Sequence, residues 1–424
     1  HDGRFYLFFG TPDEGYFMTS AVRPEGPWEP LTSLLSEPGW DDCTAIWDDK
    51  GKAYFVGTHF ADGYKTYLFK MSEDGKSIDR KSAVLINEGS GREASKLIKV
   101  NGWYYLVFSE HKPGVGRYVL AKRSKKVTGP YKEERQLALP SVEAMEPNQG
   151  GIVQGRDNNW YFLTHHGTGD WSGRIVSLLP VTWIDGWPML GDEDGRVPET
   201  MEVPVKGGPV IPLVVGDEFD GDKLKMEWQW NHNPVDEAWT LKEHKGFLRL
   251  KTNKVVSNLY EARNTLTQRM EGPECSGSLA LEVGGMKDGD RAGLAAFNGH
   301  SGILTVEKEG KDLFLVMSEE VVSLTDKEKK VNGVERKECA RVKLPRTKKV
   351  YLRVDADFRL KRDIAEFYYS MDGKDWTKIG SDFRMLFDYR KLFMGTKFGI
   401  FNYATKSAGG YVDVDYFRYE KAEK

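Results

Sequence analysis

The feature that most constrains the fold is a repeat in the first half of the chain. A turn residue followed by an aromatic-rich strand begins at Gly3, Gly51, Gly102 and Asn159, so successive copies start about 50 residues apart. A second strand-like run follows each copy, and Asp-Gly or Asn-Gly turns indicate hairpins within each unit. This period with several short strands per unit is typical of β-propeller blades, and it favours a propeller over a β-sandwich with accidental spacing.

Residues 191–216 interrupt the repeat. Prolines fix φ and remove backbone donors, so this proline-rich segment is predicted to be an extended linker. From Asp217 onward short strand-like runs return, separated by turns such as Asp372-Gly373, without useful helical periodicity. We therefore predict an all-β protein with a propeller over residues 1–190, a linker over 191–216 and a β-sandwich over 217–424.

Composition excludes several classes of function. The chain has 61 Lys and Arg against 64 Asp and Glu, so its net charge of -3 gives no electrostatic basis for binding nucleic acid. No apolar run is long enough to predict a membrane span. Three distant cysteines predict neither a disulfide framework nor a zinc site. The chain starts at His1 without an initiator Met and inside a repeat, so we expect the natural N-terminus to lie upstream. The oligomeric state is left open.

Two carboxylates occupy matched positions in neighbouring repeats. Asp42 and Glu93 each lie nine residues before the turn glycine of a repeat, and the same position in the next repeat falls beside Gln149. The segment before each repeat is expected to form the innermost strand of a blade, facing the propeller axis. We therefore expect Asp42 and Glu93 to converge at one end of the central channel, the alternative being a chance match of two surface acids.

Paired carboxylates in different environments are the groups that hydrolyse glycosidic bonds. A protonated one donates to the leaving oxygen, and an ionised one activates water or attacks the sugar carbon. A proton donor that works at neutral pH needs burial or a neighbouring negative charge. We expect Asp42 to supply such a charge beside Glu93 and to orient it.

Short motifs that extend through most of the chain carry more specific information together than singly. They are Pro12-Asp13-Glu14-Gly15, Trp40-Asp41-Asp42, the run from Trp47 to Tyr54, the run from Glu93 to Leu106, Asn148-Gln149-Gly150-Gly151, Gly173-Arg174-Ile175-Val176, Asp185-Gly186-Trp187-Pro188, Asp217-Glu218-Phe219-Asp220 and the run from Trp228 to Pro234. This set resembles glycoside hydrolase family 43, in the branch of β-xylosidases and α-L-arabinofuranosidases with a concanavalin-like C-terminal domain.

The resemblance implies an inverting, exo-acting glycoside hydrolase on a five-bladed propeller, which releases xylose or arabinose from plant polysaccharides or oligosaccharides. It implies that Glu93 is the general acid and that Asp42 modulates and orients it. It also implies that His165 contacts a calcium ion or its water shell on the axis and that Arg174 binds sugar hydroxyls. From the residues alone, an interior histidine is the preferred interpretation of His165, and a structural ion pair is an equal alternative for Arg174.

Further residues are candidate sugar or metal contacts. Gln149 is a candidate substrate contact from its motif, and Trp40 and Trp171 lie near the predicted mouth, where aromatic faces stack on sugar rings. Packing in the core or at the rim is the alternative for both tryptophans. A calcium ion in the sandwich is also considered, with solvated turns as the alternative. Its oxygen ligands would come from Asp217, Asp220, Asp413 and Asp415 if the two ends of that domain meet.

The chain departs from the family pattern in several places. Ala94 follows the acid where the family has Gly, and Cys43 stands where Pro is usual. The family's general base is an Asp of the first blade, whereas this chain has four copies of the repeat and its start resembles the opening of the second blade. The first blade and the base are therefore expected to lie outside this sequence, and Asp2, in a turn, is not assigned as the base.

Two other functions compete with hydrolysis. A propeller without its base would bind sugars without cleaving them, and in a third alternative the sandwich alone binds polysaccharide while the propeller is a scaffold. Plant-polysaccharide chemistry favours an extracellular or periplasmic location over a cytoplasmic one.

Overall fold

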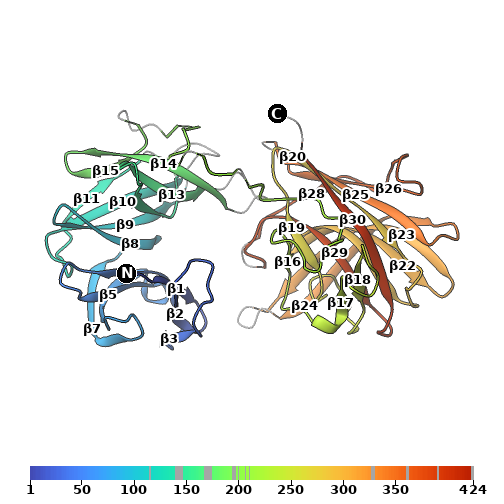
Figure 1. Cartoon of the computed structure of the whole chain (residues 1–424), viewed down its shortest axis with the longest axis horizontal. Coiled ribbons are helices and arrows are strands. Elements are labelled where there is room, and N and C mark those ends of the chain that lie inside the picture. Colours follow the sequence, from blue (N-terminus) through green and yellow to red (C-terminus); the bar gives the residue numbers. More distant parts are fainter. Residues whose placement is uncertain are drawn as a thin grey trace. The chain divides into compact units, whose positions relative to one another are not determined.

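The structure, a computed structural model, divides into two compact units that are both built from β-strands (Figure 1). The first unit takes in His1–Gly167 and Ile175–Gly207, and the second begins at Gly208 and also includes Arg174. The division at Gly207 lies within the segment 191–216, where a linker is predicted. The structure describes residues 1–113, 116–138, 147–166, 174–192, 197–198, 200–205, 207–209, 211–325, 330–359, 362–388 and 391–421.

The first unit consists of antiparallel sheets that follow one another along the chain, each in simple strand order. Because the aromatic runs of the repeat form β1, β5, β9 and β13, the predicted propeller blades are confirmed, although the described residues form four blades rather than five. The strands are β1 (Phe5–Thr11), β2 (Gly15–Ala21) and β3 (Thr32–Leu35); β4 (Trp40–Trp47), β5 (Ala53–His59), β6 (Lys65–Met71) and β7 (Ile78–Asn87); β8 (Arg92–Val100), β9 (Trp103–Lys112), β10 (Gly116–Ser124) and β11 (Glu133–Gln136); and β12 (Gly150–Gln154), β13 (Trp160–His166), β14 (Ile175–Ile184) and β15 (Trp187–Leu190).

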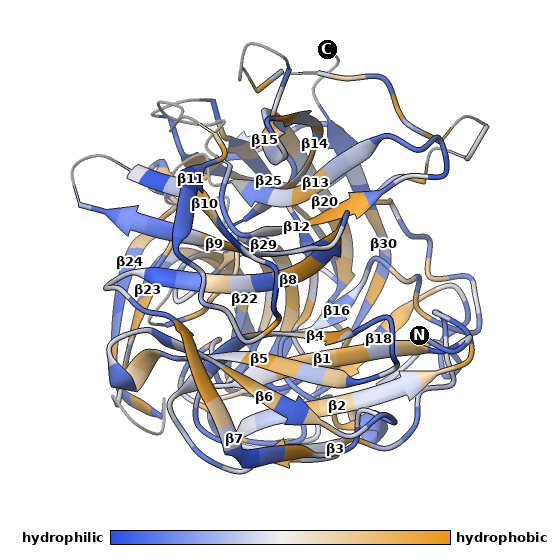
Figure 2. Cartoon of the chain, turned by 90° about the vertical axis from the view of Figure 1, so that its left-hand side faces the viewer, coloured by the Kyte–Doolittle hydropathy of each residue, from blue (hydrophilic) through white to orange (hydrophobic). Residues whose placement is uncertain are grey.

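The first strands of the blades lie toward the centre of this unit. β4 contacts both β1 and β8, and β8 contacts β12, whereas β7 and β11 lie at the outer edge (Figure 2). The first sheet has only three strands among the described residues, because it begins with a repeat strand and has no counterpart of β4, β8 or β12. The inner-strand positions of Asp42 on β4 and Glu93 on β8 agree with the prediction from the repeat.

Aromatic side chains from neighbouring strands fill the space between the first two blades. Tyr16 of β2 is completely buried and meets Phe55 of β5 edge to face, with ring centroids 4.8 Å apart. Gly57 makes room for Tyr16, because a Cβ at position 57 would lie 2.4 Å from the phenolic oxygen. Such edge-to-face aromatic pairs contribute about 0.5–1.5 kcal/mol beyond their buried area, so they help to fix the second blade against the first.

The second unit is a sandwich of two antiparallel sheets. Their strand orders are β16-β19-β29-β21-β22-β23-β24 and β17-β18-β30-β20-β25-β26-β27, with β28 paired to β26. The strands are β16 (Gln229–Trp230), β17 (Trp239–Thr240), β18 (Leu248–Lys251), β19 (Leu266–Arg269), β20 (Glu274–Glu282), β21 (Asp290–Phe297), β22 (His300–Glu309), β23 (Asp312–Leu324), β24 (Val331–Lys343), β25 (Lys349–Asp357), β26 (Ile364–Ser370), β27 (Thr377–Lys378), β28 (Phe383–Arg384), β29 (Lys397–Ala404) and β30 (Tyr411–Lys421).

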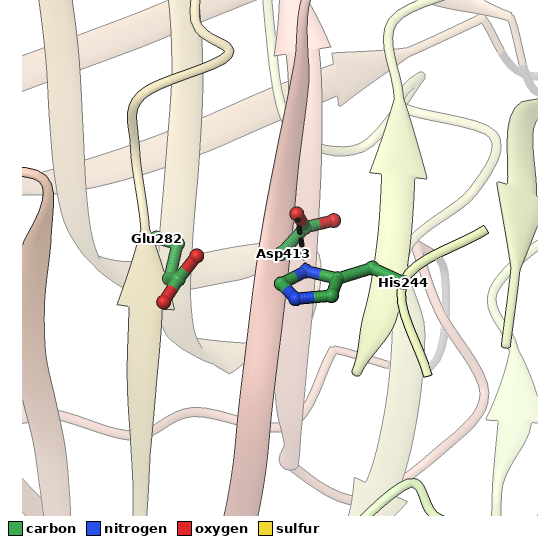
Figure 3. Close-up of side chains that lie close together, drawn as sticks. All are labelled: His244, Glu282 and Asp413. Carbon is green, nitrogen blue, oxygen red and sulfur yellow. Dashed lines mark hydrogen bonds and ion pairs between the residues drawn. The ribbon is translucent and has the colours of Figure 1, made fainter. Parts of the chain in front are cut away.

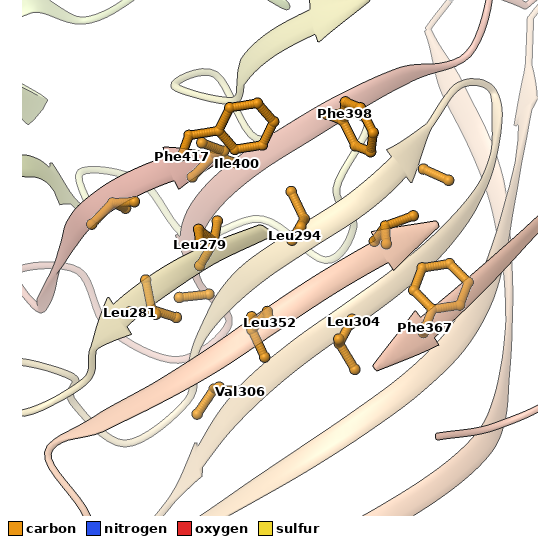
Figure 4. Packing of buried hydrophobic residues seen from close by; sticks show 14 of the residues in the cluster. Leu279, Leu281, Leu294, Leu304, Val306, Leu352, Phe367, Phe398, Ile400 and Phe417 are labelled. Atoms are coloured by element: carbon orange, nitrogen blue, oxygen red, sulfur yellow. The ribbon is translucent and has the colours of Figure 1, made fainter. Parts of the chain in front are cut away.

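The core of the sandwich follows from alternation along its strands. Every second side chain points inward, as Leu279 and Leu281 do on β20 and Leu304 and Val306 on β22, and these residues are completely buried (Figure 4). Each such side chain contributes about 1.5–3 kcal/mol when fully buried. The helical turns η1 (Phe60–Asp62) and η3 (Asp236–Ala238) are short, and within the described ranges no helix has the length and apolar character needed to span a membrane.

Candidate active site

Asp42 and Glu93 lie at matching irregularities of two inner strands. β4 shifts its register against β5 around Asp42, and β8 shifts against β9 directly after Glu93. In these bulges Asp42 has a φ of 35° and Ala94 a φ of 59°, both in the left-handed region. Bulges redirect side chains and are over-represented beside active sites, and a strained backbone persists only where its surroundings hold it. The two matched sequence positions therefore share a local backbone conformation, a bulge that contains a residue with positive φ.

A chain of hydrogen bonds holds the two bulges together. Asp42 Oδ2 accepts a hydrogen bond of 2.8 Å from the backbone N–H of Ala94, next to Glu93. Asp41 Oδ1 accepts one of 2.8 Å from the backbone N–H of Asp42, and the Tyr16 hydroxyl donates to the carbonyl oxygen of Asp41 at 2.7 Å. Burial, with smaller contributions from neighbouring acidic groups, raises the pKa of Tyr16 far above its usual range, so this hydroxyl remains a donor.

The Glu93 carboxylate receives one donor on each oxygen. Arg117 Nη1 lies 3.2 Å from Oε1, and Gln149 Nε2 lies 3.1 Å from Oε2. The Glu93 side chain is 26% exposed, so its carboxylate is supported by the protein and still reaches solvent. The structure thus brings together Asp42, Glu93 and Gln149, as predicted, and adds Arg117, whose only sequence signal is its place at the start of the strand that follows a repeat strand.

Buried polar contacts support these inner strands from behind. The hydroxyls of Thr58, Thr66 and Ser95 form a chain with oxygen separations of 3.2 and 3.3 Å. Lys96 Nζ donates to the carbonyl oxygen of Cys43 at 3.0 Å and so ties β8 to β4. Burial raises the pKa of the Cys43 thiol to about 12, so Cys43 stays protonated and is a packing residue rather than a nucleophile.

The prediction that Trp40 stacks on sugar is wrong. The Trp40 side chain is 0% exposed and stacks on His59, with ring centroids 4.4 Å apart. It lies in the cluster between the first two blades, so no sugar ring can reach its face, and core packing is its role. Trp171, the second candidate for stacking, lies outside the described residues.

His165 and Arg174 are placed as follows. His165 lies on β13 opposite Val176 of β14 and is partly buried. Within the described ranges it belongs to no group of three His, Cys, Asp or Glu side chains that could hold a metal ion. Arg174 is exposed, and its guanidinium lies 4.5 Å from the ring centroid of Phe393 in the second unit. Their roles with calcium and with sugar stay predictions.

His244, Glu282 and Asp413 of the sandwich place ligand-type atoms within 4.8 Å of one another (Figure 3). His244 Nδ1 lies 2.9 Å from Asp413 Oδ2, and Arg249 donates to both Asp413 oxygens at 2.7 and 2.8 Å. Burial raises the pKa of Asp413, but the hydrogen bonds from Arg249 and His244 outweigh it and lower this pKa overall. A guanidinium in this place does not fit a bound dication, so the group is an ion-pair network.

The calcium site considered in the sandwich does not fit the geometry either. The two ends of the domain do meet, because Asp217 pairs with Phe417 through backbone hydrogen bonds. However, the Asp217 carboxylate accepts from the Phe219 N–H and from the Trp228 indole N–H, and Asp415 is ion-paired with a lysine at 2.8 Å. Calcium requires six to eight oxygen ligands, and these carboxylates are already engaged with other donors.

These features define a class of protein. Asp42 and Glu93 lie together on inner strands of neighbouring blades, and paired carboxyl groups are the groups that glycoside hydrolases use. A β-sandwich follows this propeller in the chain.

Comparison with known proteins agrees. Residues 1–188 match the family model of glycosyl hydrolases family 43, and residues 216–420 match the beta xylosidase C-terminal concanavalin A-like domain. A beta-xylosidase of Formosa agariphila is 29% identical over 476 residues, which cover 99% of this chain and 76% of that protein. A relative from Xylanibacter ruminicola is 31% identical over 396 residues, covering 92% of this chain and 70% of the relative.

A solved structure, described as a bifunctional GH43-CE protein of Bacteroides eggerthii, has a TM-score of 0.85 and 35% identity. It covers 100% of this chain, which spans 53% of that longer protein. The chain belongs to glycosyl hydrolases family 43 and is a glycoside hydrolase, as its motifs predict.

Proposed function

We propose that this glycoside hydrolase removes xylose or arabinose from the non-reducing ends of plant polysaccharides or oligosaccharides, with inversion at the anomeric carbon. The observation that carries the proposal is the bond from Asp42 to the peptide that follows Glu93, because it makes one carboxylate the support of the other. Glu93 then has the supported but solvent-reaching position that a proton donor needs.

In this proposal the carboxylates have separate roles. Glu93 donates its proton to the glycosidic oxygen as the bond to the leaving group breaks. Asp42 does not activate water, because its Oδ2 is bound to the Ala94 N–H and the residue orients the acid instead. Inversion requires a further carboxylate about 6.5–9.5 Å from the acid, with room for a water molecule between them.

Other residues support binding in this proposal. The Gln149 amide contacts Glu93, and we propose that it also contacts the sugar bound there. Arg174 is proposed to bind sugar hydroxyls, for which guanidinium donors are suited. His165 is proposed to face a calcium ion or its water shell, a role supported by the motif resemblance.

The proposal is tested by incubating the full-length protein with 4-nitrophenyl β-xyloside, 4-nitrophenyl α-L-arabinofuranoside and xylobiose, and measuring the pentose released. Proton NMR of the first product reports the anomer, and inversion gives α-xylose from a β-xyloside. Binding of xylobiose by calorimetry without release of xylose would favour the non-catalytic alternative. Release from internal positions of a long xylan, with little free pentose, would contradict the exo mode of action.

A further inference from the structure

Glu93 and Arg117 come from two strands of the same blade that are not neighbours. Glu93 of β8 lies opposite Ser109 of β9, and Ser109 in turn lies opposite Val119 of β10. Arg117 is two residues before Val119, so it belongs to the same face of β10. The two long side chains therefore meet across the middle strand, where Ser109 is small and buried.

The ion pair itself is expected to contribute little to the stability of the blade. The side chains of Arg117 and Glu93 are 22% and 26% exposed, and partly exposed ion pairs contribute little to stability. The blade is held by other interactions, among them the completely buried Leu106 and Ala121 and the backbone ladder from β8 to β11. A cation at this place is better explained by the chemistry of the carboxylate it touches.

The two donors on Glu93 differ in what they allow. A guanidinium only donates hydrogen bonds, so the oxygen that faces Arg117 cannot carry the acid proton toward it. A side-chain amide both donates and accepts, so Gln149 matches an ionised oxygen with its NH₂ group and a protonated one with its carbonyl group. The asymmetry assigns different tasks to Oε1 and Oε2 of Glu93.

We propose that Arg117 is a positioning residue for the acid: it holds Oε1, so that the transferable proton is carried on Oε2, beside Gln149. The inference rests on the proposed function, in which Glu93 is the proton donor. When the glycosidic bond breaks, the proton moves from Oε2 to the leaving oxygen, and Glu93 becomes a carboxylate that Arg117 and Gln149 both stabilise. Without Arg117, the carboxyl group turns more freely and presents its proton less often.

The test compares Arg117→Met and Arg117→Lys, both made in the full-length enzyme, with the full-length parent on xylobiose and on aryl xylosides of increasing leaving-group ability. General acid catalysis is worth roughly 10²–10⁴-fold, so partial misplacement in Arg117→Met should lower turnover of xylobiose by about 10–100-fold. The 2,4-dinitrophenyl xyloside needs no proton and should change by less than about threefold. Arg117→Lys, which keeps a donor and the charge, should recover part of the loss.

Arg123→Met is the matched control, because Arg123 lies on the same strand and is ion-paired with Glu133 at 2.7 Å, away from Glu93. It should leave the ratio between the two substrates unchanged. Equal losses on both substrates in Arg117→Met, at an unaltered unfolding temperature, would overturn the positioning role alone. A parent enzyme that releases no pentose from any substrate would overturn the proposed function and this inference with it.

Discussion

Asp42 Oδ2 accepts a hydrogen bond of 2.8 Å from the backbone N–H of Ala94, across two neighbouring blades. Both residues have positive φ and lie in matched bulges. Because Ala94 directly follows Glu93, the Asp42 carboxylate of one blade fixes the backbone beside Glu93 in the next blade. The pair therefore acts as a unit, and substitutions at either residue should affect both backbone stability and proton donation.

The hydrogen bond can be tested at Asp42. Asp42→Ala leaves the Ala94 N–H without its acceptor, and an unsatisfied buried donor costs about 1–3 kcal/mol. Asn keeps an accepting oxygen and tolerates positive φ, so Asp42→Asn should retain most of the stability. Thermal unfolding followed by tryptophan fluorescence measures both variants. Equal unfolding temperatures for the two would show that the bond does not support the bulge.

The backbone of Ala94 gives a second prediction. A side chain in the left-handed region costs about 1–2 kcal/mol, whereas glycine adopts it freely but loses about 0.5–1 kcal/mol of chain entropy. Ala94→Gly should therefore leave the free energy of unfolding unchanged or raise it by about 1 kcal/mol. Ala94→Val, β-branched at the same φ of 59°, should lower it clearly. A glycine variant less stable than the parent would contradict this strain argument.

The acid itself is tested with Glu93→Gln. The amide keeps the shape but has no proton to give, so turnover of xylobiose should fall by roughly 10²–10⁴-fold. Aryl xylosides with good leaving groups should lose much less. Glu133→Gln, an exposed position on β11 of the same blade, is the control and should be neutral. A comparable loss on both kinds of substrate would count against Glu93 as the proton donor.

The stability of the sandwich is expected to depend on pH through Asp413. The pKa of Asp413 is lowered in the folded protein, so its contribution to stability is fully present above the ordinary value near 3.9 and is lost as pH falls through the lower folded value. Arg249→Met leaves a buried carboxylate without its main partner and should cost about 3–5 kcal/mol at pH 7. The variant should also lose less stability than the parent between pH 7 and pH 3, as measured by urea unfolding.

Much of the fold was predictable because each copy of the repeat forms the same kind of blade. Blades of one architecture place equivalent residues at equivalent radii, so matched spacing was enough to bring Asp42 and Glu93 together. Arg117 could not be found this way, since its contact depends on the face of β10 and on the small Ser109 between the strands. Trp40 was misplaced for a different reason. It is two residues from Asp42 and would share its face in a regular strand, but the bulge at Asp42 breaks that alternation.

Gly57 lies behind the hydrogen bonds that hold Asp42 in place. Its missing side chain admits the Tyr16 ring, and Tyr16 holds the carbonyl oxygen of Asp41, next to Asp42. A single methyl group at position 57 would displace that ring and so loosen the support of Glu93, the proposed proton donor. The backbone position of Asp42 at the propeller axis therefore depends in part on the absence of one carbon atom behind it.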